Sequence, residues 1–117
     1  MGSDRRRVPE DRRKTTRVPA VFAVVKKAGG GRVQLCQAED IAPSGITIRR
    51  PRGAADLPST EIALAFALPG SGEEISARGL VVSDGVAGPF RRTGVRFVAI
   101  RPEHAQLIAG YCRRSGR

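Results

Sequence analysis

Apolar and polar residues alternate with a period of two along most of the chain, a pattern typical of half-buried β-strands. The alternation is clearest in residues 61–68, where Ile62, Leu64, Phe66 and Leu68 mark one face and alanines occupy much of the other. Turn-forming residues separate similar runs, most obviously Gly29–Gly31, Pro43–Gly45, Pro69–Gly72 and Asp84–Pro89. The pattern predicts strands over residues 18–25, 32–38, 46–50, 61–68, 74–83 and 90–100.

The period changes in the last segment, where apolar residues recur every three or four positions. Ala105, Ile108 and Cys112 share this spacing, which predicts a core-facing helix over residues 102–114. Pro102 suits the first helical position, and His104 is expected on the helix surface. The chain is therefore predicted to be mostly β: a small six-stranded antiparallel barrel, closed or nearly closed, with a C-terminal helix.

The N-terminal segment has a different texture from the rest of the chain. Residues 1–17 carry seven basic and three acidic side chains and almost no large apolar residue. This composition predicts a flexible basic arm over residues 1–11, followed by a single domain over residues 12–117.

The charge of the chain indicates an anionic partner. The formal net charge is +10, and 18 of the 21 basic residues are arginine. A guanidinium group grips phosphates through two parallel hydrogen bonds and stacks on flat rings, so a nucleotide or a nucleic acid is the expected partner class. Aromatic residues make up only 4% of the chain, which disfavours single-stranded nucleic acid, whose bases stack on aromatic side chains.

Several other classes of function find no support in the sequence. No apolar run approaches the length of about 20 residues that a membrane span needs, so we expect no membrane insertion and a cytoplasmic location. One histidine and two distant cysteines do not form a zinc motif, and free thiols are favoured over a disulfide. No nucleophile motif accompanies the histidine, so we expect neither an enzyme nor a bound metal or cofactor.

Two short motifs, taken together, resemble the PilZ domain family. Arg13 and Arg17 match the family pattern of two arginines separated by three residues. Asp40 and Gly45 match its second pattern: Asp or Asn, any residue, Ser, two residues, Gly. The segment 94–97, Gly-Val-Arg-Phe, is similar to a late strand of the family. The resemblance extends from about residue 12 to the C-terminus and implies a six-stranded barrel with a C-terminal helix that binds cyclic di-GMP.

This resemblance implies roles for the arginines and for the aspartate. Arg13 and Arg17, with Arg12 as a third cation, would contact the phosphates of the ligand or the O6 and N7 atoms of guanine. Asp40 would accept hydrogen bonds from guanine N1 and N2, which adenine cannot supply. Ligand binding would then order residues 5–17 across the barrel and signal to a partner protein.

The second motif departs from the family pattern at Ala42, which stands where the family usually has serine. The missing hydrogen bond is expected to weaken binding about two- to tenfold. Ser44 is a possible substitute for that hydroxyl group. Gly45 is expected to adopt a positive φ in a tight turn and to allow close approach of the ligand.

Two other functions are compatible with these residues. A degenerate PilZ-like domain would dock proteins without binding the nucleotide. With either function, the protein is expected to be a monomer or a dimer. A small basic barrel that binds nucleic acid is the less favoured alternative, supported by the net charge and by Arg49, Arg50, Arg52, Arg91, Arg92, Arg113, Arg114 and Arg117.

Overall fold

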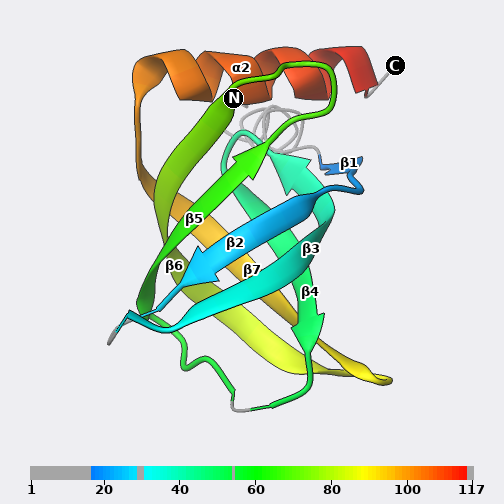
Figure 1. Ribbon diagram of the computed structural model, residues 1–117, viewed down its shortest axis with the longest axis vertical. Helices are drawn as coiled ribbons and strands as arrows, with labels where there is room; N and C mark the ends of the chain where they lie inside the picture. The colour runs from blue at the N-terminus through cyan, green and yellow to red at the C-terminus, as the bar shows by residue number, and fades with distance from the viewer. Residues whose placement is uncertain (1–16, 29–30, 54, 116–117) are drawn as a thin grey trace, which may run out of the picture.

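The computed structural model describes residues 17–28, 31–53 and 55–115, which form seven strands and one helix. The strands are β1 (Val18–Pro19), β2 (Ala23–Lys27), β3 (Val33–Ala42), β4 (Gly45–Pro51), β5 (Glu61–Ala67), β6 (Glu74–Ala87) and β7 (Phe90–Ile100). The helix is α2 (Pro102–Ser115). All the strand pairs are antiparallel, in the order β1-β3-β2-β5-β6-β7-β4, and pairing of β4 with β3 closes the sheet (Figure 1). The predicted six-stranded barrel with a C-terminal helix is confirmed.

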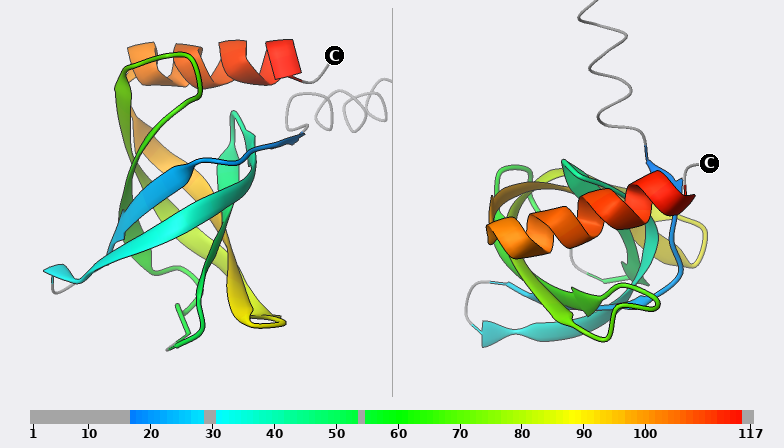
Figure 2. Two further views of the ribbon diagram at one scale, coloured as in Figure 1. Left: turned by 45° about the vertical axis from the view of Figure 1, so that its right-hand side comes forward. Right: turned by 90° about the horizontal axis from the view of Figure 1, so that it is seen from above.

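The helix lies across one open end of the barrel, as the side and top views in Figure 2 show. Ile108 of α2 is fully buried, and the thiol of Cys112 donates to the backbone oxygen of Ile41 at 3.7 Å. His104 is only 6% exposed, and its Nδ1 accepts a hydrogen bond of 3.3 Å from the backbone of Ser76. The prediction that His104 lies on the helix surface is therefore wrong. Its imidazole is buried because it links the first turn of the helix to β6.

The predicted strand over residues 18–25 is divided into β1 and β2. Val18 pairs with Ile41, whereas Ala23 pairs with Gln37, so residues 20–22 contain one residue more than the facing segment of β3. The backbone of Ala20 still donates to Glu39, and Phe22 accepts from Ala38. The segment therefore follows β3 along its whole length, with an irregularity that alternation alone does not reveal.

The β6–β7 hairpin is longer than expected, because residues 84–87 continue β6 instead of forming a turn. The chain reverses over Gly88 and Pro89, and Gly88 has a φ of 64°. A glycine with positive φ permits a two-residue turn, whose twist matches that of the flanking strands. The extension lengthens the β6–β7 hairpin at the end of the barrel away from α2 (Figure 1). Within it, Asp84 lies opposite Thr93.

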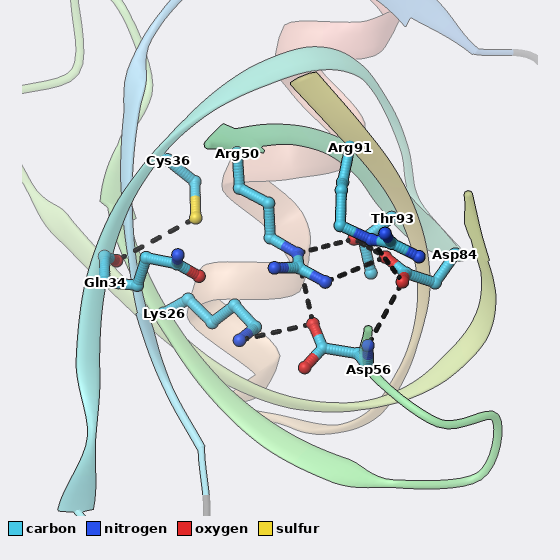
Figure 3. A network of polar contacts seen from close by, with 8 residues as sticks. All are labelled: Lys26, Gln34, Cys36, Arg50, Asp56, Asp84, Arg91 and Thr93. Carbon is cyan, nitrogen blue, oxygen red and sulfur yellow. Dashed lines mark hydrogen bonds and ion pairs between the residues drawn. The ribbon is translucent and has the colours of Figure 1, made fainter. Parts of the chain in front are cut away.

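The barrel interior is apolar near α2 and charged at the other end. The apolar part is built mainly from isoleucine and valine on the inner faces of the strands, including Val24, Ile41, Ile46, Ile62 and Ile75. The charged part contains three residues of which 5% or less is exposed, Lys26, Arg50 and Thr93, together with Asp56 and Asp84 (Figure 3).

Asp84 is the centre of this charged network. Its Oδ1 accepts from Arg50 Nη2 at 3.1 Å and from the Thr93 hydroxyl, and its Oδ2 accepts from Arg91 Nε at 2.9 Å and from the Asp56 backbone at 3.1 Å. Burial of the Asp84 carboxylate acts to raise its pKa, but these hydrogen bonds outweigh burial and hold the pKa below its usual range. The carboxylate is therefore ionised and joins β4, β6, β7 and the loop between β4 and β5.

We expect Asp84→Asn to lower the free energy of unfolding by about 3 kcal/mol at pH 7, because it leaves the buried guanidinium of Arg50 without a charged partner at this position. The folded-state pKa of Asp84 lies below the value of about 3.9 in an unfolded chain, so its stabilisation is complete above about pH 4 and is lost as the pH falls through the folded-state pKa. The difference between wild type and variant should therefore narrow below about pH 4.

Urea unfolding followed by circular dichroism across this pH range measures the difference. Glu61→Gln is the matched control, because the Arg78–Glu61 pair has a similar length, 2.7 Å, but lies on the surface. Loss of this surface ion pair should lower the free energy of unfolding by about 1 kcal/mol or less. Equal destabilisation by the two variants would contradict a central role for Asp84.

Candidate functional site

The two predicted motifs meet at the end of β3, next to β1. Val18 pairs with Ile41, and Pro19 pairs with Asp40, so Arg17 enters the described part of the chain beside Asp40. Arg17 Nη1 donates to Asp40 Oδ1 at 2.9 Å, across 23 positions of sequence. The side chains remain 40% and 31% exposed. The structure thus brings together one residue from each motif, in a pair that is accessible to a ligand.

A bulge in β3 places Asp40 on the outer surface. The register between β3 and β4 shifts between Ala38 and Asp40, which makes Glu39 an extra residue. Cys36 and Ala38 face the interior, and uninterrupted alternation would direct Asp40 inward after them. After the bulge, Glu39 and Asp40 are both partly exposed and Ile41 is buried instead.

Ala42 ends β3, Ser44 lies in the turn that follows and Gly45 begins β4, and the environments of the three residues differ. Ala42 is fully buried, whereas Ser44 is exposed. The backbone oxygen of Ser44 accepts a 2.9 Å hydrogen bond from Phe97 on β7. The exposed side chain of Ser44 therefore lies in the turn, two positions after the alanine that replaces the family's serine.

Gly45 is required for close packing of strands, and not for the positive φ that its sequence context suggests. It is the first residue of β4, and the glycines with positive φ among the described residues lie elsewhere. A Cβ atom at this position would lie 2.2 Å from the backbone oxygen of Val95 on β7. A side chain here would force β4 away from β7, so the expectation of a left-handed turn residue is wrong.

Arg49 and Arg92 form an arginine cluster around Glu39, and neither arginine belongs to the two sequence motifs. Arg92 Nε and Nη2 donate to the two oxygens of Glu39 at 2.6 and 3.1 Å, and Arg49 Nε lies 3.5 Å from the same carboxylate. The hydrogen bond from Arg92 lowers the pKa of Glu39. Pairing of Arg49 with Arg92 across β4 and β7 brings these side chains together, and this register was not evident from the sequence.

The two adjacent acids therefore have different partners. Glu39 accepts two hydrogen bonds from the guanidinium of Arg92, whereas Asp40 accepts one side-chain hydrogen bond among the described residues. Asp40 is consequently the more available acceptor for a ligand that carries hydrogen-bond donors. Arg12 and Arg13, the remaining predicted site residues, lie outside the described residues.

The described part of the chain meets the requirements neither of a metal site nor of a membrane-spanning helix. Within residues 17–28, 31–53 and 55–115, no cluster of three or more His, Cys, Asp and Glu side chains is arranged to hold a metal ion. Over the same residues, α2 is too short and too polar to cross a membrane. Both cysteines are free thiols.

Comparison with known proteins agrees with this architecture. Residues 11–114 match the family model of the PilZ domain. No curated protein matches the chain by sequence.

Three solved structures have similar folds at low sequence identity. The inhibitor of motility MotI/DgrA of Bacillus subtilis is 20% identical with a TM-score of 0.76, over 88% of this chain and 50% of that chain. The PilZ domain of YcgR from Escherichia coli, solved with c-di-GMP, is 14% identical with a TM-score of 0.70, over 91% and 92% of the two chains. The MrkH–c-di-GMP complex from K. pneumonia is 16% identical with a TM-score of 0.72, over 87% and 51%.

The chain spans about half the length of MotI/DgrA and MrkH but nearly all of the YcgR domain. At these identities the similarity shows the fold, and the family assignment rests on the sequence match over residues 11–114. The resemblance found in the sequence is confirmed: the chain belongs to the PilZ domain family.

Proposed function

We propose that this protein is a receptor for cyclic di-GMP, which binds on the outer face of the barrel beside the β3–β4 turn. The observation that carries this proposal is the exposed contact between Arg17 and Asp40, which joins the two motifs. The structures of YcgR and MrkH solved with c-di-GMP support the choice of ligand. The proposed role is binding and signalling, with no catalytic step.

A guanine base is complementary to both members of this ion pair. Asp40 would accept from the N1 and N2 donors of guanine, and Arg17 would donate to its O6 and N7 acceptors or to a phosphate. An exposed ion pair contributes about 1 kcal/mol or less, so exchanging it for contacts with a ligand costs little. The Arg17–Asp40 pair therefore keeps both groups at the surface, where contacts with a ligand can replace their contact with each other.

Arg12 and Arg13 are proposed to add phosphate contacts, and Ser44 to offer a hydroxyl group at the β3–β4 turn. Gly45 contributes through the strand packing that positions the turn. Ala42 is buried and supplies no polar side-chain atom, so we expect this protein to bind the ligand more weakly than a domain with the full family motif.

We expect saturable binding of cyclic di-GMP in isothermal titration calorimetry, and about tenfold or greater weakening in Arg17→Ala and in Asp40→Asn, because each removes a charge-assisted hydrogen bond. Arg78→Ala and Glu61→Gln are matched controls, since they break another exposed ion pair of similar length, 2.7 Å, elsewhere on the barrel. These controls should leave the affinity unchanged.

Absence of binding to the wild type would reject the receptor function and favour a protein-docking module that does not bind the nucleotide. Binding that all four variants share equally would instead locate the ligand away from the two motifs. A barrel that binds nucleic acid would reveal itself by a steep dependence of affinity on salt concentration.

The discrimination between guanine and adenine tests Asp40 separately. Cyclic di-AMP presents no N1 or N2 donors to this carboxylate, so we expect it to bind about tenfold or more weakly than cyclic di-GMP. Competition titrations measure the ratio of the two affinities. In Asp40→Asn the ratio should approach one, and a ratio that the substitution leaves unchanged would contradict guanine recognition by Asp40.

The signalling step is proposed to be ordering of the N-terminal segment, residues 5–17, over the bound ligand, which presents a changed surface to a partner protein. Trypsin cleaves after the basic residues of this segment, and we expect cyclic di-GMP to slow that cleavage severalfold while cyclic di-AMP does not. Mass spectrometry of the products locates the protected sites. Unchanged cleavage at saturating ligand would contradict ordering of the segment.

A further inference from the structure

A second cationic site lies inside the barrel, at the end away from α2. A cavity of about 270 Å³ opens between the start of β3, the end of β2 and the loop that follows β4. Lys26, Arg50 and Asp56 line its inner part, and the exposed Arg32 also belongs to its lining. The cavity has several times the volume of about 30 Å³ that one water molecule occupies in the liquid.

Lys26 is the least compensated cation in this interior. Its side chain is only 6% exposed, and its Nζ lies 3.2 Å from Asp56 Oδ2. The same oxygen lies 3.3 Å from Arg50 Nε, so one carboxylate oxygen forms ion pairs with two cations (Figure 3). An ammonium group has three donors, and Asp56 is the partner that Lys26 has among the described residues.

The other carboxylate of the network is already saturated. Asp84 accepts from Arg50, Arg91, Thr93 and the backbone of Asp56, as described above. In the described part of the chain, this network combines three cations, Lys26, Arg50 and Arg91, with two carboxylates, Asp56 and Asp84. These five described side chains together carry one excess positive charge, which is unfavourable in a low-dielectric environment unless an anion balances it.

We propose that this cavity binds a small oxyanion of the phosphate class, held by the ammonium group of Lys26 and by the guanidinium of Arg32. Such an anion would accept from the Lys26 donors that point away from Asp56 and would neutralise the excess charge. Arg32 has no side-chain partner in the described structure, and its exposed position lets it close on an anion from the solvent side. The site is separate from Arg17 and Asp40, because these residues lie where β1 pairs with the end of β3, next to α2, and Figure 1 shows β1 near α2.

The lysine content of the chain makes a direct test possible. Lys14, Lys26 and Lys27 are its three lysines, so carbon-13 labelling of lysine Cε gives three signals. Lys27→Met assigns its signal and is the matched control for Lys26→Met, because Lys27 is the next residue of β2 and is exposed. Inorganic phosphate is the probe, titrated against chloride at constant ionic strength.

We expect the Lys26 signal to shift saturably with phosphate, and the Lys14 and Lys27 signals to remain in place. Lys26→Met should weaken phosphate binding about tenfold or more, and Lys27→Met should not. Arg32→Ala, an exposed substitution that leaves the barrel interior intact, should weaken binding severalfold. This variant keeps the test decisive if Lys26→Met does not fold.

Three outcomes would overturn the proposal: an unmoved Lys26 signal at high phosphate, an equal shift in chloride, or unchanged affinity in Arg32→Ala. A phosphate-dependent shift confined to Lys14, in the N-terminal segment, would also reject it and would indicate an adventitious surface anion. Since the readout is the Lys26 side chain, the result does not depend on whether cyclic di-GMP binds beside Asp40.

Discussion

The bulge in β3 at Glu39 is the local feature on which the accessible site depends. On one side of the bulge, Cys36 and Ala38 face the interior, and on the other Ile41 does. The extra residue lets β3 continue its pairing with β4 while it reverses the face on which its side chains lie. Without it, the carboxylate of Asp40 would point into an apolar core, where an unpaired charge is strongly unfavourable. The bulge therefore determines both the closure of the barrel and the exposure of its candidate ligand acceptor.

The same closed barrel provides two chemically different ends. Near α2 the interior is filled with branched aliphatic side chains, and stacked rings of Phe22 and Phe66, 5.5 Å apart, continue this packing. At the far end, Asp84 holds together three strands and a loop through charged hydrogen bonds. The exposed Arg17–Asp40 pair near α2 and the interior cations therefore lie toward opposite ends of the barrel.

Much of the fold could be predicted from alternation, and the exceptions have identifiable physical causes. The inward faces of β5 and of the first half of β6 follow the pattern of their sequences, and β5 pairs with both of its neighbours without a break in register. The buried charges were not predicted, although their positions carried a signal: Lys26 alternates with Val24, and Arg50 with Ile46 and Ile48. A charged residue on an inner face needs a partner, but Asp56 follows Lys26 by 30 positions and Asp84 follows Arg50 by 34.

The residues of the two motifs differ in what they reveal about function. Gly45 is needed wherever β4 and β7 approach this closely, so its presence follows from the fold and says little about a ligand. Ala42 is buried and likewise reports on packing. Arg17 and Asp40 are different, because an exposed ion pair adds at most about 1 kcal/mol to stability and the barrel would close without it. A pair that the fold does not require, formed by residues from both motifs on an accessible surface, is therefore the strongest structural argument that this chain has kept a binding site and not merely the architecture of its family.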